Sequence, residues 1–330
     1  MSTTVFDGHC HIFNGAILKD LVHPTMDTAA KTKSVRGWLD YMKEMAEILV
    51  DSQKTNNKFV LTALQNGFPN ADNYATIPLM MDINFMHNDS LNVGQTIVSK
   101  PVVWEDNIHT QISELQELSL NGNCYPFFAI DPRRPGAIDA ILDGQFVTKK
   151  AGNFFGIKIY PRLGYHPMAD KLPELYAYCA KNNIPITTHC SAGGFPPWET
   201  PSGEFCNPEN FRPALEANPN LIIDFAHFGT TNLDWGKSII DLMKKFPNVY
   251  SDLSCKVGDK ELATFKSIYW NSDPNDIIKQ RTLYGSDFDI FYFTECGMDM
   301  NELIQSFKDE FTPDELHNMM SVLPAKFLAL

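Results

Sequence analysis

Residues 6–13 read FDGHCHIF, which places two imidazoles and a carboxylate in an otherwise apolar run. Residues i, i+2 and i+4 of a β-strand share one face, so Asp7, His9 and His11 are predicted to point together. Two imidazoles on one strand can bind a zinc-like ion when other strands complete the ligand set. A buried histidine pair can also be purely structural, so the rest of the chain has to decide between these interpretations.

Short β-rich apolar runs, each followed by a helical pattern, recur along the chain. A closed parallel barrel needs eight strands, and eight candidates are present: residues 4–12, 77–85, 125–130, 154–160, 184–190, 221–227, 248–253 and 282–287. Helical patterns are clearest at residues 35–51, 107–120, 172–182, 235–245 and 298–310, and Thr312 is predicted to cap a last helix. The sequence therefore predicts an α/β fold, a (β/α)8 TIM barrel with a helical insertion after the first strand, as one domain over residues 1–330.

The predicted strands end in side chains that titrate or bind metals. The fifth, sixth and eighth runs end in His189, His227 and Asp287, and Lys158 lies near the end of the fourth. Parallel barrels place their active sites at the carboxyl ends of the strands. Chance could supply one or two such residues, but five strands with polar ends favour a metal-dependent site at the barrel mouth.

These strand ends resemble the amidohydrolase superfamily, especially its amidohydrolase-related branch of metal-dependent hydrolases, lactonases and aminocarboxymuconate-semialdehyde or resorcylate-type decarboxylases. The resemblance spans nearly the whole chain and rests on six residues: His9, His11, Lys158, His189, His227 and Asp287. It implies that His9, His11 and His189 are metal ligands. It also implies that Asp287 both binds metal and carries a proton during catalysis.

Three positions keep two interpretations each. The resemblance implies that His227 either binds a second metal ion or acts as a catalytic base and hydrogen-bond donor near the substrate. It implies that Lys158 either is carboxylated and bridges two metal ions or faces a carboxylate of the substrate. Asp7 is expected either to orient a histidine or to cap the first loop. The expected cofactor is one or two divalent metal ions, with Zn²⁺ preferred over Mn²⁺.

The chemistry of such a site leaves two enzymatic activities open. A metal held by neutral imidazoles and one carboxylate can acidify water and polarise a substrate oxygen, which favours hydrolysis of a small carboxylated ester, lactone or amide. Nearly the same ligands would serve a non-oxidative decarboxylase, in which a proton from Asp287 or His227 replaces carbon dioxide. A barrel without catalytic activity is the third alternative, which the intact set of strand-end residues disfavours.

Loops after the third and fourth runs are expected to flank the mouth and contact the substrate. Arginine suits bidentate recognition of a carboxylate, although a loop arginine can equally be a solvated surface charge. Phe195, Trp198 and Phe205 are expected to line a lid or to pack locally. The candidate substrate-binding residues are Arg133, Arg162, Tyr165 and His166.

Composition sets limits on partners and compartment. The formal net charge of −13 disfavours nucleic-acid and anionic-membrane partners, because a phosphate surface would repel the chain. No secretory signal or membrane-spanning stretch is visible, and the seven cysteines are scattered without a CxxC pair. We therefore expect reduced thiols, a cytoplasmic location and a small, carboxylated substrate. A homodimer stays open, because most soluble oligomers are symmetric.

Overall fold

Parallel strands form the centre of the fold, as seen in a computed structural model that describes residues 3–12, 53–85, 88–96, 106–194, 201–256, 258–271, 277–288 and 300–330. The strands pair in chain order, as a two-stranded sheet β1-β2 and a six-stranded sheet β3-β4-β5-β6-β7-β8. All neighbours are parallel. The bounds are β1 Thr4–Cys10, β2 Asn73–Pro78, β3 Phe127–Ile130, β4 Gly156–Ile159, β5 Ile186–Thr188, β6 Ile223–Phe225, β7 Val249–Asp252 and β8 Thr282–Leu283.

The two sheets are joined at both of their edges. Parallel bridges at Thr76–Cys124 and Leu79–Phe127 connect β2 to β3, and a bridge at Cys10–Phe288 connects β1 to the chain after β8. Further along this second join, the backbone N–H of Asp287 donates to the carbonyl of His9 at 2.8 Å. The strands thus follow one another around the molecule and back to β1, which is the order of a (β/α)8 barrel, with regular ladders interrupted at the two joins.

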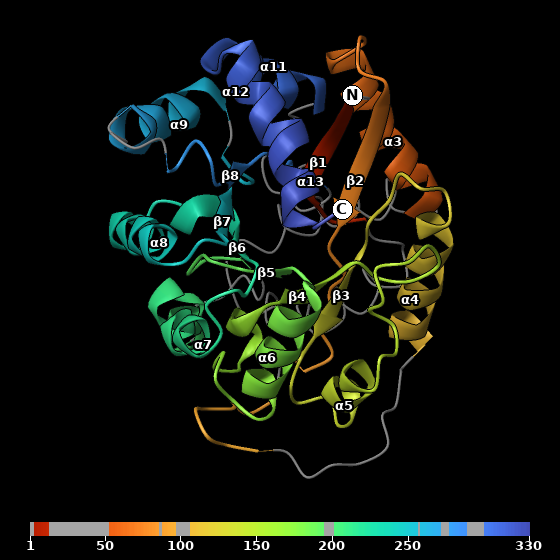
Figure 1. Ribbon diagram of the computed structural model, residues 1–330, viewed down its shortest axis with the longest axis vertical. Helices are drawn as coiled ribbons and strands as arrows, with labels where there is room; N and C mark the ends of the chain where they lie inside the picture. The colour runs from red at the N-terminus through yellow and green to blue at the C-terminus, as the bar shows by residue number, and fades with distance from the viewer. Residues whose placement is uncertain are drawn as a thin grey trace, which may run out of the picture.

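Helices surround the strands on the outside (Figure 1). Helix α8, Leu233–Lys245, shows why they pack there: it buries Trp235, Ile239, Leu242 and Met243 along one stripe, and the Asn232 side chain caps its first turn. The other α-helices are α3 Gln53–Gly67, α4 Asp106–Ser119, α5 Ala137–Leu142, α6 Leu172–Asn182, α7 Arg212–Ala217, α9 Gly258–Phe265, α11 Met300–Glu310, α12 Pro313–His317 and α13 Leu323–Phe327. Short 3-10 helices lie at Pro161–Leu163, Pro201–Cys206, Pro208–Phe211 and Ala226–Gly229, and π-helical turns at Lys266–Trp270 and Asn318–Val322.

Most predicted elements are confirmed, with one displaced strand. The second run was predicted at residues 77–85, but β2 ends at Pro78. Leu79 still forms a bridge with Phe127, but the backbone of Met81 pairs with a side chain instead of a strand: Gln111 accepts from its N–H and donates to its carbonyl, both at 3.0 Å. Thr312 caps α12 in a capping box with Glu315. The predicted helix at residues 35–51, and with it the insertion after the first strand, lies outside the described residues.

The amino ends of the strands enclose an apolar core that the C-terminal helix closes. The ring of Phe327 on α13 lies 5.9 Å from that of Phe127 and 5.5 Å from that of Tyr250. This cluster comprises Phe6, Ala75, Ile77, Leu79, Phe127, Phe155, Ile222, Tyr250, Leu283, Leu323, Phe327 and Leu328. The bottom of the barrel is therefore a packed plug of side chains, and any polar site has to lie at the other end.

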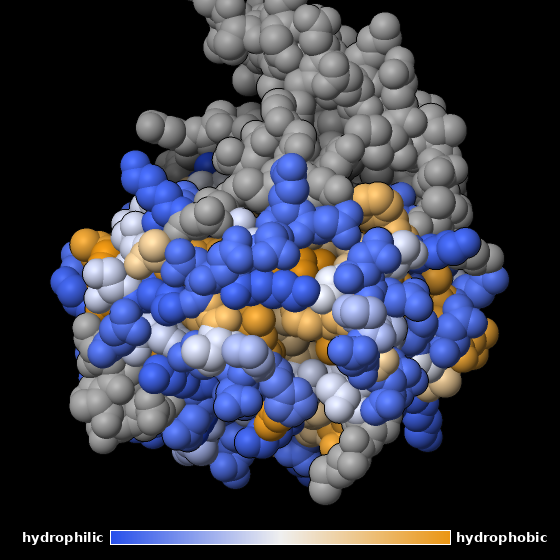
Figure 2. All heavy atoms as spheres, turned by 90° about the horizontal axis from the view of Figure 1, so that it is seen from above, coloured by the Kyte–Doolittle hydropathy of each residue, from blue (hydrophilic) through white to orange (hydrophobic). Residues whose placement is uncertain are grey.

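On the coloured part of the face shown in Figure 2, hydrophobic side chains lie in groups among hydrophilic ones, with the most extended group near the centre. The large apolar side chains that are exposed in the described residues are scattered over the fold: Phe59, Val93, Leu120, Leu233, Ile268 and Leu330. None of the described helices has the length and apolar character needed to cross a bilayer.

Candidate metal centre

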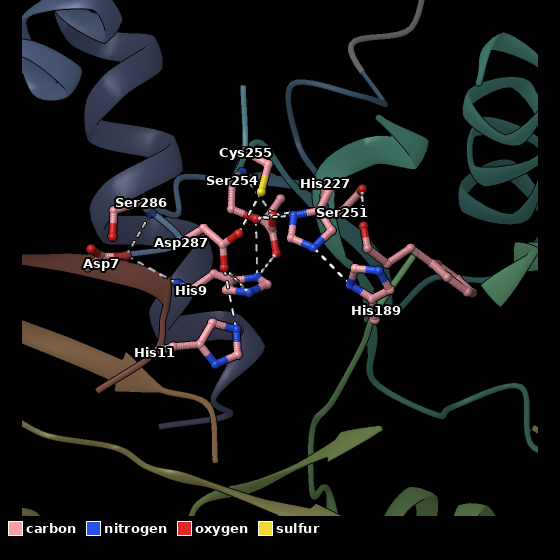
Figure 3. Close-up of polar contacts among 12 residues, drawn as sticks. Asp7, His9, His11, His189, His227, Ser251, Ser254, Cys255, Ser286 and Asp287 are labelled. Atoms are coloured by element: carbon pink, nitrogen blue, oxygen red, sulfur yellow. Dashed lines mark hydrogen bonds and ion pairs between the residues drawn. The ribbon is translucent and has the colours of Figure 1, made fainter. Parts of the chain in front are cut away.

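One extra residue in β1 sets the direction of its polar side chains. Asp7 pairs with Thr76 and Cys10 with Pro78, so three steps along β1 match two steps along β2. Such a bulge breaks the alternation of faces. The Asp7 carboxylate turns back and accepts from the N–H groups of His9 at 3.2 Å and Ser286 at 3.0 Å. Figure 3 shows it beside Ser286 and away from the imidazoles, so the prediction that Asp7 shares a face with His9 and His11 is wrong.

His9 and His11 converge on Asp287, which follows β8. The Nε2 atoms of His9 and His11 lie 3.2 Å and 3.4 Å from Asp287 Oδ1 (Figure 3). All three side chains are buried. His9 Nε2 and Asp287 Oδ1 have no hydrogen-bond partner among the described residues, which is rare for buried polar atoms. Ligand atoms of the three residues lie within 4.8 Å of one another, so this donor set fits a divalent cation such as Zn²⁺.

Asp252, at the end of β7, fixes the orientation of this set and was missed by the sequence analysis. The Nδ1–H of His9 donates to Asp252 Oδ2 at 2.6 Å, which turns His9 Nε2 toward Asp287. Asp252 Oδ1 accepts from the N–H groups of His227 and Ser254 at 3.0 Å and 2.9 Å. Burial raises the pKa of Asp252, but the attraction and hydrogen bond of His9 outweigh it and hold the pKa well below its usual range. A carboxylate behind a metal-binding imidazole is a common orienting device.

His189 follows β5 and His227 follows β6, and their rings lie beside each other. His227 Nε2 lies 3.1 Å from His189 Nδ1, and His227 Nδ1 lies 2.8 Å from the Ser254 hydroxyl. His189 Nε2 donates to the Gly193 carbonyl at 2.8 Å. Burial lowers the pKa of both rings, that of His227 to about 4, so both are neutral near pH 7.

The described residues contain three groups whose ligand atoms are close enough for one ion. They are His9 with His11 and Asp287, His9 with His227 and Asp252, and His227 with Cys255 and Asp287. His227 therefore belongs to two of these groups, whereas His189 belongs to none and contacts the site through His227. The structure thus brings all four predicted histidines together, with His189 one contact farther from Asp287 than the others.

Lys158 lies in the barrel interior on β4. Its side chain is 1% exposed, and Nζ has no hydrogen-bond partner among the described residues. In the sheet register it stands beside Thr187, which in turn stands beside Asp224 of β6. Burial lowers the pKa of Lys158, and the charges of Asp287, Asp252 and Asp224 oppose that shift. An amine is therefore held within the electrostatic reach of the metal-binding carboxylate.

The four candidate substrate-binding residues differ in what they contact. Arg133 is buried and forms a bidentate pair with Asp131, at 2.9 Å and 2.6 Å, so the alternative of a solvated surface charge is wrong for it. Tyr165 donates its O–H to the Ile130 carbonyl at 2.9 Å and accepts from the Tyr160 N–H at 2.6 Å. These two side chains hold the loops after β3 and β4 in place.

Arg162 and His166 contact the long loop after β5. Arg162 is also buried, contrary to the surface-charge alternative, and donates to the Ala192 carbonyl. The His166 ring packs edge-on against Phe205 at 5.4 Å, which confirms local packing for that aromatic residue. The other two aromatic residues of the predicted lid, 195 and 198, lie outside the described residues. Substrate binding by Arg133, Arg162, Tyr165 and His166 stays a prediction.

Comparisons with known proteins agree with this architecture. A family model described as amidohydrolase matches residues 121–325. Similar solved structures include a "probable 2-pyrone-4,6-dicarboxylic acid hydrolase" from Acinetobacter baumannii (TM-score 0.58, 9% identity, 100% of each chain covered). A protein of the same proposed activity from Pseudomonas putida has TM-score 0.57, 12% identity and coverage of 100% of this chain and 98% of that one. Amidohydrolase 2 from Bifidobacterium longum subsp. infantis has TM-score 0.51, 13% identity and 100% coverage of both chains. No curated protein matches the sequence significantly.

Proposed function

The chain belongs to the amidohydrolase family, a family of enzymes that are mostly metal-dependent hydrolases, and from that premise we propose that it hydrolyses a small carboxylated ester, lactone or amide. Zn²⁺ is the proposed cation, because neutral imidazoles with one carboxylate suit it. The observation that carries the proposal is the convergence of His9 Nε2 and His11 Nε2 on a single oxygen of Asp287 inside a buried site.

The residues of the site have separable roles in this reaction. A divalent cation, when bound, supplies positive charge that acidifies water and polarises a substrate carbonyl. His9, His11 and Asp287 would hold it, and Asp252 keeps His9 in the tautomer whose Nε2 lone pair faces the site. His11 is fixed in the same way, because its Nδ1 donates to the Leu79 carbonyl at 2.9 Å.

Asp287 is the proposed proton carrier. Burial raises its pKa, but the neighbouring imidazoles, His9 first, outweigh that effect and hold the pKa well below the usual range. The carboxylate is therefore ionised and can take a proton from the attacking water. It then returns that proton to the leaving oxygen or nitrogen as the acyl bond breaks, so the carboxylate ends in its starting state.

Lys158 supports a carboxylated substrate. A buried amine without a hydrogen-bond partner among the described residues gains more from an anionic ligand than an exposed lysine does, because little water competes for it. We assign to Lys158 the binding of a substrate carboxylate. Carboxylation of Nζ to form a bridge between two cations is the alternative role.

The compartment proposed for this activity is the cytoplasm. The six cysteines in the described part of the chain are all free, five of them buried, which supports a reducing environment.

Two measurements test the proposal. Metal per chain is determined by elemental analysis on the whole chain, purified without chelator or His tag, for wild type, His11→Ala and the control His109→Ala. The control removes an exposed imidazole on α4. We expect bound metal in wild type and the control and its loss in His11→Ala with an unchanged circular dichroism spectrum. Metal retained by a folded His11→Ala variant would remove the proposed site.

The second measurement identifies the reaction. A panel of small carboxylated esters, lactones and amides is incubated in ¹⁸O-labelled water, and a parallel panel of aromatic and enol-bearing acids in D₂O. Hydrolysis places solvent oxygen in the product, which is the expected result. Release of carbon dioxide with solvent deuterium at carbon would instead assign the decarboxylase activity to the same ligand set.

A further inference from the structure

Cys255 lies at the metal centre, although no sequence pattern predicted a role for it there. It follows β7 on the loop that also carries Ser254, and its Sγ lies 2.5 Å from Asp287 Oδ2 (Figure 3). Among the cysteines in the described ranges it is the one that is partly exposed, and the other five are buried. Its backbone is in the left-handed region, at φ 58°, which costs energy for a residue with a Cβ.

The two oxygens of Asp287 face two different donor sets. Oδ1 faces the Nε2 atoms of His9 and His11, and Oδ2 faces Cys255. Ligand atoms of His227, Cys255 and Asp287 lie within 4.8 Å of one another. Asp287 is 2% exposed, and its Oδ1 has no hydrogen-bond partner in the described part of the chain. The carboxylate is thus placed to bind one cation with each oxygen.

We propose that Cys255 is a metal ligand, and that Cys255, His227 and Asp287 Oδ2 form a second cation position next to the one at His9 and His11. This inference deepens the proposed function, because it concerns the same site. On binding, the thiol releases its proton to solvent, and a sulfur–metal bond replaces the hydrogen bond to Asp287. A thiolate selects Zn²⁺ or Cd²⁺ over Mn²⁺ or Mg²⁺, so the second position is thiophilic whereas the first is not.

His227 has a lone pair available for this role. Its Nε2 faces His189 Nδ1 at 3.1 Å, and two neutral imidazoles in such a contact share a single N–H. Because His189 donates through Nε2 to the Gly193 carbonyl, its Nδ1 accepts from His227 Nε2–H, and the lone pair of neutral His227 is on Nδ1. The Ser254 hydroxyl lies 2.8 Å from this Nδ1 but donates its proton to Asp252 Oδ1, so the lone pair stays available to a cation.

The competing role for Cys255 is to position Asp287 by a hydrogen bond. Cys255→Ser separates the two roles, because a hydroxyl still donates to Asp287 Oδ2 but is a poor ligand for soft cations. Cys179→Ala is the control, since it removes a buried thiol from α6 on the outside of the barrel.

The experiment titrates Co²⁺ into the metal-depleted whole chain and follows both d–d absorption and the thiolate-to-Co²⁺ charge-transfer band in the near ultraviolet. We expect the charge-transfer band in wild type and in Cys179→Ala and its loss in Cys255→Ser, which still binds one equivalent of Co²⁺ at the histidines. In competition with a chelator, Cd²⁺ binding to the second position weakens by at least about tenfold in Cys255→Ser, while Mn²⁺ binding to the first changes little.

The outcomes distinguish this inference from the proposed function. Co²⁺ bound without a charge-transfer band in wild type, or a band that persists in Cys255→Ser, overturns the cysteine ligand and leaves the histidine site standing. Absence of any Co²⁺ binding to the folded wild-type chain overturns both.

Discussion

The two ends of the barrel strands carry different kinds of side chain, and the change from apolar to polar takes place within two to four residues. On β7 the interior changes from Tyr250 in the apolar plug to Asp252 at the site, and after β8 it changes from Leu283 to Asp287. On β1 Phe6 belongs to the plug and His9 to the metal centre. The same strands thus carry the packing that stabilises the fold at one end and the groups that would perform chemistry at the other.

The backbone differs between the two ends as well. His227, Cys255 and Asp287 have φ of 67°, 58° and 52°, and each follows the carboxyl end of a strand. In the plug, none of the described residues has a positive φ. Strain of this kind persists only where the surrounding structure holds it, and here the apolar end supplies that support. The groups that would perform chemistry and the side chains that stabilise the fold are therefore separated along the strand axis.

Asp287→Asn should produce the largest effect. The substitution removes the negative charge from the side chain that both His9 and His11 face, and it removes the proton carrier. We therefore expect turnover of the identified substrate to fall by about 10²–10⁴-fold. Elemental analysis should also show metal loss. The melting temperature should fall only by the amount that the bound cation itself contributes to stability. Asp314→Asn, at an exposed position of α12, is the matched control. Full activity in Asp287→Asn would mean that chemistry takes place elsewhere.

Phe127→Ala tests the apolar plug at the other end of the barrel. Truncating this fully buried ring should destabilise the fold by about 3–5 kcal/mol, because it leaves a cavity against Phe327. Urea unfolding measures the change, and Leu120→Ala, at an exposed position, should change stability by less than about 0.5 kcal/mol. We expect the folded fraction of Phe127→Ala to keep its metal. Metal loss well below the unfolding midpoint would show that the two ends are not separable.

Asp252→Asn examines the support behind the metal ligands. The amide oxygen can still accept from the His227 and Ser254 N–H groups, but the charge that orients His9 is lost. We expect Zn²⁺ affinity to fall by about 10–100-fold, measured against a competing chelator. A change in stability of the metal-free chain without a change in affinity would assign Asp252 to the fold instead of to the site.

Asp7→Asn sharpens the boundary between the two regions, because Asp7 lies near the site but turns away from it. Burial raises the pKa of Asp7 from 3.8 to about 6, despite the N–H groups that lower it. The native state therefore binds more protons than the unfolded state between about pH 4 and 6, and stability falls as pH rises through that window.

Replacing the carboxylate with an amide should remove this fall. At pH 7 the variant should be more stable than wild type by up to about 3 kcal/mol, and the difference should vanish below about pH 4. Urea unfolding of the metal-free chain at a series of pH values measures it. Parallel stability curves for the two proteins would mean that Asp7 is ionised in the fold at no cost.

The sequence predicted the fold well where periodicity and strand ends agreed. All eight predicted runs overlap the observed strands, the second only at residues 77–78, and the capped helix at Thr312 is present. The second strand was misplaced because the backbone of Met81 pairs with the Gln111 side chain instead of a neighbouring strand, and no local pattern encodes a partner 30 residues away. The bulge in β1 was likewise invisible, because its register depends on pairing with β2.

The order of residue types along the chain was enough to predict which residues could form a metal centre. A histidine, lysine or aspartate at the end of a predicted strand is a local pattern, and the carboxyl ends of parallel strands must meet. The role of each group depends on the tertiary structure: Asp7 faces away, Asp252 orients His9, and Asp287 presents one oxygen to the histidines and the other to Cys255. Those assignments depend on contacts between residues far apart in the chain, at distances of a few ångströms, and such contacts are set by the packing of the whole barrel.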